Sequence, residues 1–367
     1  MEQKIWHQHY PKEVNLEINP SAYTSLLDFT EQRLKKFANN TSFINMGKSI
    51  SYKELDVLSE NFAAYLQNHT NLKQGDRVAI QMPNLLQYPI ALFGALKAGI
   101  IIVNINPLYT AKEMEHQIND SGAKAIIILS NFAFNLEKII KSTSLETVIV
   151  TNIGDMLSGV KKPLVNFVVK NVKKMVPKFS LQASIKWKDV MKKGKASKYT
   201  RPEVKPDDVA FLQYTGGTTG VSKGAMLTHK NMISNMEQIR EWMRPKMKEN
   251  EEIIITALPL YHIFALTVNC FSMMTIGAKN VLITNPRDMK AFCKDLAKYP
   301  FTVITGVNTL FNGLLNQEKF RNLDFSKLKV SVAGGMAVQH AIADKWEKLT
   351  NVPIVEGYGL TETAPVA

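Results

Sequence analysis

Residues 214 to 224 read Tyr-Thr-Gly-Gly-Thr-Thr-Gly-Val-Ser-Lys-Gly and carry the strongest signal in the sequence. Glycines allow backbone N–H groups to approach an oxyanion closely, and Lys223 adds a mobile cation. The apolar residues 209–215 come directly before this loop and predict a strand that enters it. The pattern therefore predicts phosphate binding at the end of a strand.

Two familiar phosphate-binding patterns do not fit this segment. No Gly-Lys-Ser/Thr follows a glycine at the interval of a P-loop, and the glycines do not form G-x-G-x-x-G. A plain glycine-rich hairpin turn is the alternative. It needs one or two glycines but leaves Thr215, Thr218, Thr219 and Ser222 unexplained.

The rest of the sequence alternates amphipathic helices with short apolar runs, which predicts an α/β fold with a mostly parallel sheet. In such folds ligands bind at the carboxyl ends of strands. We expect one α/β unit over residues 1–203 and a second over 204–367. The predicted helices are 52–66, 85–98 and 231–243, and the predicted strands are 76–82, 100–105, 125–129, 147–150, 209–215, 253–257, 280–284, 302–305 and 329–333.

Composition indicates a folded enzyme-like body. The 367 residues are 45% hydrophobic and 21% charged, which is ordinary for globular proteins. Cys270 and Cys293 are the two cysteines, and we expect them to be reduced and buried in a cytoplasmic protein. The first residues contain no apolar signal-peptide region. The most apolar stretch, 88–105, is interrupted by Lys97 and Gly99, so no membrane span is predicted.

Positive charge is concentrated in one segment. Residues 161–201 contain twelve Lys and one Arg against Asp189, a local net charge of +12 in a chain with a net charge of +13. Within it, residues 164–179 predict a basic amphipathic helix that binds an anionic membrane surface. The alternative is a core-packed helix with solvated lysines. No zinc-ligand spacing or basic–aromatic array accompanies the charge, so no nucleic-acid partner is expected. The apolar stripe of this helix is expected to hold Val165, Val168, Val172, Met175, Val176 and Phe179.

The loop at 214–224 resembles the phosphate loop of the adenylate-forming (acyl-CoA synthetase) superfamily, and three further segments match in order. These are LKAGIIIVNINP at 96–107, LPLYH at 258–262 and EGYGLTETAP at 356–365. The resemblance covers the whole chain and is strongest to the bacterial long-chain fatty-acid–CoA ligases. It implies two Rossmann-like αβ subdomains of a large N-terminal domain.

The resemblance also implies a two-step reaction. A fatty carboxylate attacks ATP, giving acyl-AMP and pyrophosphate, and CoA then displaces AMP. ATP, Mg²⁺ and CoA are thus expected, with Glu362 as the metal ligand and Lys223, Thr361, Glu362 and His262 as catalytic residues. The nucleotide is expected to contact Thr215, Gly216, Gly217, Thr218, Thr219, Gly220, Ser222, Lys223, Gly334, Gly335, Gly357, Tyr358, Gly359 and Thr361.

Other interpretations of three of these residues stay open from the residues alone. A Thr-Glu pair such as Thr361-Glu362 often only caps a helix. Tyr358, which the resemblance puts on adenine, could instead be a core tyrosine. His262 could pack or cap. In an active site it would orient the fatty carboxylate rather than take a proton, because that acid is already ionised at neutral pH.

The sequence given ends at Ala367, directly after the adenylate motif. Members of the family continue into a C-terminal domain that supplies a lysine and most of the CoA surface. We therefore expect this chain to lack that domain and to be inactive alone. Two other functions stay open, a ligase for another carboxylic acid and a truncated module that binds ATP or an acyl group without turnover. A cytoplasmic protein peripheral to the inner membrane is expected, and a homodimer is left open.

Overall fold

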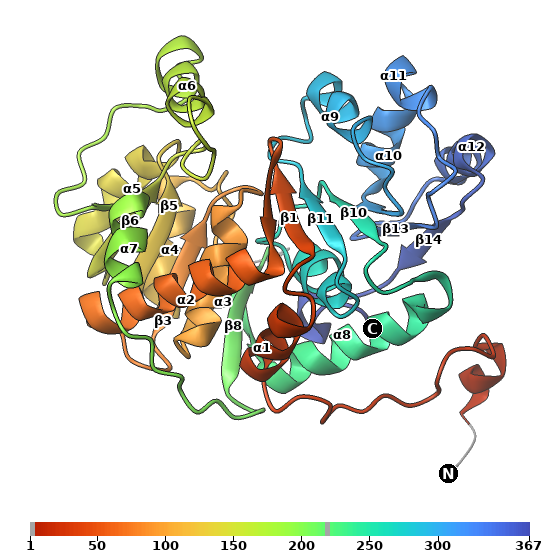
Figure 1. Cartoon of the computed structure of the whole chain (residues 1–367), viewed down its shortest axis with the longest axis horizontal. Helices are drawn as coiled ribbons and strands as arrows, with labels where there is room; N and C mark the ends of the chain where they lie inside the picture. Colours follow the sequence, from red (N-terminus) through yellow and green to blue (C-terminus); the bar gives the residue numbers. More distant parts are fainter. Residues whose placement is uncertain (1–3, 217–220) are drawn as a thin grey trace.

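The computed structural model describes residues 4–216 and 221–367, which form two mainly parallel β-sheets with helices packed on them (Figure 1). This confirms the predicted α/β class. The first sheet has the order β7-β6-β5-β3-β4-β8-β9, with bounds β3 Arg77–Gln81, β4 Ile101–Asn104, β5 Ala123–Leu129, β6 Thr147–Thr151, β7 Ile185–Lys186, β8 Val209–Thr215 and β9 Lys223–Thr228.

The second sheet contains strands from both ends of the sequence. Its order is β14-β13-β12-β10-β11-β1-β2, and β1 pairs in parallel with β11, with Phe43 opposite Asn280. The strands are β1 Thr41–Asn45, β2 Lys48–Ser51, β10 Ile253–Thr256, β11 Lys279–Leu282, β12 Val303–Gly306, β13 Val330–Gly334 and β14 Ile354–Gly357. Since β8 and β9 belong to the first sheet, the predicted boundary between residues 203 and 204 does not separate the two sheets.

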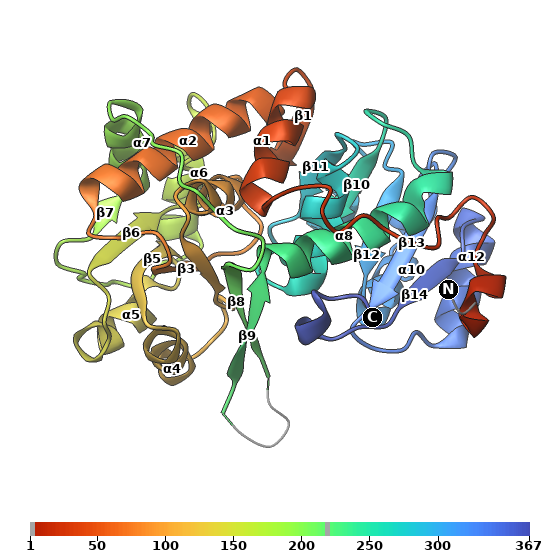
Figure 2. The same ribbon diagram turned by 90° about the horizontal axis from the view of Figure 1, so that it is seen from below.

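The helices form layers on and between the sheets (Figures 1 and 2). α4 and α5 pack on one face of the first sheet, and α2, α3 and α7 on the other. The α-helical bounds are α1 Leu26–Lys36, α2 Tyr52–His69, α3 Gln87–Lys97, α4 Ala111–Ser121, α5 Ala133–Ile139, α6 Lys161–Phe167, α7 Trp187–Lys195, α8 His229–Met243, α9 Met289–Leu296, α10 Asn308–Leu315, α11 Glu318–Arg321 and α12 His340–Thr350.

The remaining helices are π or 3₁₀ segments. η3 and η5 are π-helical, and the others are 3₁₀ turns. Their bounds are η1 Ile5–His9, η2 Ile140–Ser142, η3 Val168–Val172, η4 Arg244–Lys246, η5 Ala265–Ser272 and η6 Thr361–Thr363.

Sequence signals at the helix starts explain several of these bounds. Ser51 begins α2 and accepts a hydrogen bond from the Glu54 backbone N–H, while the Glu54 side chain bonds back to Ser51. Thr110 and Glu113 form the same capping box at α4. Each box satisfies backbone N–H groups that the first turn of a helix leaves without partners.

One core unites the layers between the sheets. Phe271 of η5 lies at its centre, with ring centroids 6.3 Å from Phe29 of α1, 5.8 Å from Phe93 of α3 and 6.2 Å from Phe211 of β8. All four rings are fully buried, and fully burying one aromatic side chain contributes roughly 1.5–3 kcal/mol. The two sheets are therefore joined by packing as well as by chain crossings.

The basic segment differs from its prediction. The helix over 164–179 is wrong beyond Val172, because η3 ends there and Lys174 takes a left-handed φ of 50°. Pro177 disfavours helical geometry at the residue before it and has no N–H to donate. The core-packed alternative is also not observed, since none of the described residues of α6 or η3 is buried.

The expectation that the two cysteines are buried is confirmed by the fold. Cys270 and Cys293 are both unpaired and buried. Among the described residues, no helix combines the length and the hydropathy needed to cross a bilayer.

We predict that His229 makes stability depend on pH. Leu26 donates its backbone N–H to the Nδ1 atom of this buried ring at 3.1 Å, and burial lowers the pKa of His229 to about 4. In the unfolded chain this histidine takes up a proton as the pH falls below 6.5, its ordinary pKa, whereas in the folded chain it stays neutral until the pH approaches 4. Stability is thus full above pH 6.5 and falls by about 2–3 kcal/mol as the pH drops toward 4.

Urea unfolding at pH 7 and pH 4.5 measures this loss. His229→Asn keeps an acceptor near the Nδ1 position but cannot titrate, so the variant should lack this part of the acid sensitivity. Equal losses of stability in the two proteins would contradict the assignment.

Candidate active site

A cavity of about 1370 Å³ lies where the carboxyl ends of strands from both sheets meet. Asn104 ends β4, Thr215 ends β8, Gly334 ends β13 and Gly357 ends β14, and all four residues line the cavity. This is the edge at which α/β sheets bind ligands. The predicted site residues that line it are Thr215, Gly216, His262, Gly334, Gly335, Gly357, Tyr358, Gly359, Thr361 and Glu362.

The remaining predicted residues belong to the antiparallel pair of β8 and β9 and the loop that connects them, residues 209–228, which we call the phosphate hairpin. Gly217, Thr218, Thr219 and Gly220 lie outside the described residues. Ser222 and Lys223 are described but are not among the lining residues of the cavity, and Lys223 is exposed at the start of β9 opposite Thr215. The two strands of this hairpin project from the molecule (Figure 2).

Glycines shape the wall formed by β13 and β14. The two strands are parallel, with Gly334 opposite Gly357. Gly335 has a φ of +81°, which non-glycine residues rarely adopt. A Cβ atom on Gly359 would lie 1.9 Å from the Pro365 carbonyl oxygen, so no side chain fits there. Tyr358, between Gly357 and Gly359 in the sequence, is 75% exposed and is not a core residue.

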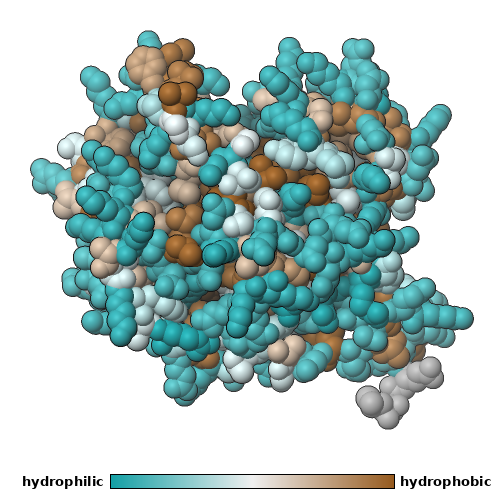
Figure 3. All heavy atoms as spheres, in the orientation of Figure 1, coloured by the Kyte–Doolittle hydropathy of each residue, from teal (hydrophilic) through white to brown (hydrophobic). Residues whose placement is uncertain are grey.

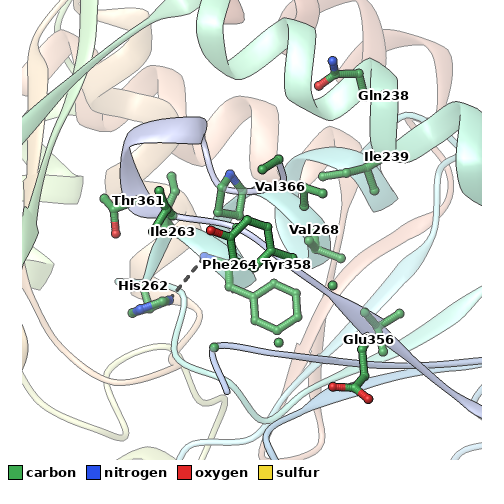
Figure 4. A pocket seen from close by; sticks show the side chains of 18 of the residues that line it. Gln238, Ile239, His262, Ile263, Phe264, Val268, Glu356, Tyr358, Thr361 and Val366 are labelled. Carbon is green, nitrogen blue, oxygen red and sulfur yellow. Dashed lines mark hydrogen bonds between the residues drawn. The ribbon is translucent and has the colours of Figure 1, made fainter. Parts of the chain in front are cut away.

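The segment with Thr361 and Glu362 is anchored to the helices behind it. The Asn235 amide of α8 donates to the Val366 carbonyl at 2.7 Å and accepts from the Val366 N–H at 3.1 Å. Thr267 of η5 donates to the Ala364 carbonyl at 2.9 Å. These bonds hold η6 against the cavity, and the side chains of Thr361 and Tyr358 are among those that line it (Figure 4).

The loop that carries His262 is fixed by three buried side chains. Asn84 donates to the carbonyls of Thr256 and Leu258, both at 2.9 Å, and accepts from the Leu260 N–H at 2.8 Å. The Tyr88 hydroxyl donates toward the Leu260 carbonyl at 2.8 Å. Gln213 donates to the Tyr261 carbonyl at 2.7 Å. Buried backbone groups need such partners, so this loop has one favoured position.

The hydrogen bonding of His262 defines its tautomer. The Phe264 backbone N–H donates to the Nδ1 atom at 3.3 Å, the contact drawn in Figure 4. Nδ1 is thus an acceptor, and a neutral ring then carries its proton on Nε2. Protein atoms around the ring remove part of its hydration, which disfavours the charged form and lowers the pKa of His262 below its ordinary value of 6.5. His262 can therefore donate a hydrogen bond from Nε2 at neutral pH.

Several lining residues were not singled out from the sequence. They fall into two groups, polar residues around the ends of β4 and β8 and aromatic residues from distant elements. Strand-end position could have indicated Asn104, Asn106 and Gln213, and the motif around His262 could have indicated Tyr261, whereas only the fold brings residues such as Tyr10 and Trp242 to the cavity. The residues are Asn104, Asn106, Gln117, Gln213, Tyr109, Tyr261, Phe264, Tyr10 and Trp242.

Chemically, the cavity combines an exposed aromatic ring, glycine turns, a neutral histidine donor and the Glu362 carboxylate next to the Thr361 hydroxyl. Such a set suits a purine nucleotide with its phosphates and a second, less polar ligand. The model of the AMP-binding enzyme family matches residues 30–367, and the chain belongs to that family.

Individual relatives agree with this placement. The chain is 55% identical over 363 residues to the long-chain-fatty-acid–CoA ligase of Escherichia coli O157:H7, covering 99% of this chain and 65% of the relative. It thus spans about two thirds of that protein's length. A crystal structure of a long-chain-fatty-acid–CoA ligase from Archaeoglobus fulgidus superposes with a TM-score of 0.76 at 25% identity, over 96% of this chain and 68% of the other.

A third comparison concerns the fold alone. The crystal structure of an anthranilate CoA ligase in complex with anthranoyl-AMP has a TM-score of 0.80 at 20% identity, over 95% of this chain and 63% of that one. Its fold matches that of the described residues, which supports the prediction of the N-terminal architecture of adenylate-forming enzymes.

Proposed function

We propose that this protein is an ATP-dependent long-chain fatty-acid–CoA ligase. The fatty carboxylate attacks the α-phosphorus of ATP and releases pyrophosphate, and the CoA thiol then displaces AMP from the acyl-AMP. The gathering of ten predicted residues around one cavity carries this proposal. The substrate class is suggested by the name of the relative with 55% identity.

Within this proposal the adenosine and phosphate ends of ATP contact different parts of the cavity. The Tyr358 ring packs on adenine beside Gly334, Gly335 and Gly357. Thr215, Gly216, Ser222 and Lys223 contact the phosphates, together with Gly217, Thr218, Thr219 and Gly220. Negative charge grows on the leaving pyrophosphate, so the Lys223 cation and the loop N–H groups favour the transition state more than the bound substrate.

His262 is proposed to orient the fatty carboxylate. Its Nε2–H donates to one carboxylate oxygen, while the Phe264 N–H on Nδ1 keeps the ring turned. No proton needs to be removed from the acid, because a carboxylic acid with an ordinary pKa is ionised at neutral pH. Because the pKa of His262 is lowered, the ring stays neutral and donates from Nε2 without placing a second positive charge beside the Mg²⁺ and Lys223 that act on the phosphates.

Mg²⁺ is proposed to be held by Glu362 with Thr361 beside it. Both offer oxygen atoms at the cavity, and Glu362 makes no salt bridge with the residues that the structure describes. Mg²⁺ keeps several waters and binds through one or two carboxylates plus substrate phosphates, so a carboxylate at the cavity is a suitable ligand. The ion would neutralise phosphate charge.

Two rival functions make different predictions. A ligase for another acid would prefer acetate, an aryl acid or an amino acid over palmitate and oleate. A non-catalytic module would bind ATP or an acyl group without exchanging pyrophosphate. Acid-dependent ATP–pyrophosphate exchange by the intact protein, measured with a panel of carboxylic acids, separates the three.

We predict that Lys223→Ala and Glu362→Ala each slow palmitate-dependent pyrophosphate exchange by about 10²–10³ in the intact protein. Each change removes a charge, direct or metal-mediated, that opposes the charge developing on pyrophosphate. Lys230→Ala, an exposed lysine on the following helix, serves as the control and should keep its rate. Near wild-type exchange in either test variant would remove the role assigned to that residue.

We predict that two substitutions of His262 differ. His262→Gln can offer an amide N–H near the position of Nε2, whereas His262→Asn matches only the Nδ1 side. The KM for the fatty acid should rise about tenfold more in the Asn variant, as expected for losing one hydrogen bond to a charged group. Indistinguishable kinetics of the two variants would argue against a carboxylate contact from Nε2.

A second proposed property is peripheral binding to the inner, anionic face of the cytoplasmic membrane. Leu164, Phe167 and Val172 of α6 and η3 are 59%, 58% and 64% exposed, and Val160 and Met175 extend this patch. Hydrophobic side chains gather over α6 in the space-filling view (Figure 3). Nearby lysines would attract anionic lipid while the apolar side chains insert. They are Lys161, Lys162, Lys170, Lys173, Lys174 and Lys178.

The exposed patch shares Val172 and Met175 with the stripe expected from the sequence but differs from it at other positions. Val165 and Val168 of that stripe are only partly exposed. Leu164 and Phe167, which it did not include, face outward.

We predict that Lys170, Lys173 and Lys174 changed together to Glu weaken binding to phosphatidylglycerol vesicles by about 10²-fold or more, at about 1 kcal/mol per basic residue. Leu164→Asn with Phe167→Asn should weaken it as well. The charge-matched control changes three other exposed lysines to Glu, Lys345 and Lys348 of α12 and Lys327 before β13. Cosedimentation measures binding, and equal losses in test and control variants would show a nonspecific charge effect.

A further inference from the structure

Helix α4 contacts both strands of the phosphate hairpin through polar side chains. His116 lies 2.9 Å, through Nε2, from the backbone carbonyl oxygen of Ser222. One turn later, Asp120 accepts a hydrogen bond of 2.5 Å from the hydroxyl of Tyr214. Ser222 comes just before β9 and Tyr214 is in β8, so one helix face is bonded to both sides of the loop.

The chemistry of the first contact is fixed by its acceptor. A carbonyl oxygen can only accept, so the Nε2 atom of His116 must carry the hydrogen. The Ser222 carbonyl directly precedes Lys223, whose partner across the hairpin is Thr215. His116 therefore restrains the backbone next to two of the residues assigned to the phosphates.

The second contact holds the opposite strand. The Tyr214 ring covers Gly224, where a Cβ atom would lie 3.0 Å from the ring. Burial and the neighbouring Asp120 carboxylate raise the pKa of Tyr214 above its ordinary value, so the hydroxyl stays protonated and can donate. The rings of Tyr214 and His116 also meet edge to face, with centroids 6.4 Å apart. Both contacts thus form one cluster.

A hairpin of this kind needs outside support. β9 is the last strand of its sheet and pairs with β8 alone, and Lys223 and Met226 in it are exposed. β8 pairs with β4 only from Phe211 to Gln213, so the hairpin is two-stranded from Tyr214 onward, and a two-stranded hairpin is marginally stable by itself in water. Groups that act on a transition state must hold their positions to about 0.5 Å, which requires supporting contacts.

We propose that His116 and Asp120 are positioning residues that fix the phosphate hairpin so that Thr215, Ser222 and Lys223 meet the phosphates of ATP. The inference rests on the proposed adenylation activity. Neither residue touches the nucleotide in this arrangement. Both act through the hairpin backbone and through Tyr214.

The test compares two substitutions of His116 in the intact protein. His116→Gln can place an amide N–H near the position of Nε2 and keep the bond to Ser222, whereas His116→Asn cannot reach it. The Asn variant should raise the KM for ATP about tenfold, with a smaller effect on kcat, and the Gln variant should stay near wild type. Tyr214→Phe, which keeps the ring and loses the hydroxyl, should resemble His116→Asn.

Amide hydrogen exchange supplies a readout that does not require turnover. Peptides of β8 and β9 should exchange faster in His116→Asn than in His116→Gln, while peptides of β5 and β12 stay unchanged. His69→Asn is the matched control, because His69 contacts Ser197 through its Nε2 at the same 2.9 Å away from the cavity. It should alter neither ATP kinetics nor hairpin exchange.

Two results would overturn the proposal. One is equal exchange of the hairpin in the Asn and Gln variants. The other is faster hairpin exchange without a change in the KM for ATP. A wild-type protein that exchanges no pyrophosphate would instead refute the proposed function, and hydrogen exchange would still decide whether α4 holds the hairpin.

Discussion

The arrangement of the site depends on the hydrogen bonds made by the side-chain amide of Asn84. It bonds to three backbone groups between Thr256 and Leu260, at the point where the chain leaves β10 of the second sheet. Asn84 itself follows β3 of the first sheet, and its own carbonyl accepts from Thr284 beyond β11. One side chain thus satisfies the irregular backbone between the sheets. Leaving these groups without partners would cost about 1–3 kcal/mol each.

From this contact the geometry of the cavity follows in order. Tyr88 and Gln213 complete the hydrogen bonding of the loop, and His262 is held at the end of that loop facing the ends of β13 and β14. Asn104 lies between the two, with its Oδ1 atom 2.8 Å from the Tyr88 hydroxyl and its Nδ2 group donating to Gln213 at 3.1 Å. These polar side chains lie in the largest core of the molecule, where a partly satisfied network would be costly. The same network therefore stabilises the contact between the sheets and orients the histidine.

Much of this was accessible from the sequence, and the failures have physical causes. β8 was predicted with the bounds it has, and most other strands were predicted within two residues, because buried parallel strands read as short apolar runs. Which strands belong to which sheet could not be predicted, because the spacing of apolar residues indicates which side chains are buried and not which strands pair with each other. Thr215, His262 and Glu362, which line the cavity, were predicted from local motifs. His116 and Asn84 were missed because their partners lie 106 and at least 172 residues away in the chain.

The exchange of strands between the sheets also constrains how the chain can fold. β1 is made early in synthesis, yet its parallel partner β11 lies 237 residues later, as the Asn45–Leu282 contact shows. Until β11 has been synthesised, β1 can pair only with β2 and its other edge has no partner. Contacts of such separation slow folding, and unpaired strand edges promote association with other chains. The contact between β1 and β11, on which the second sheet depends, therefore cannot form before residue 282 has been synthesised.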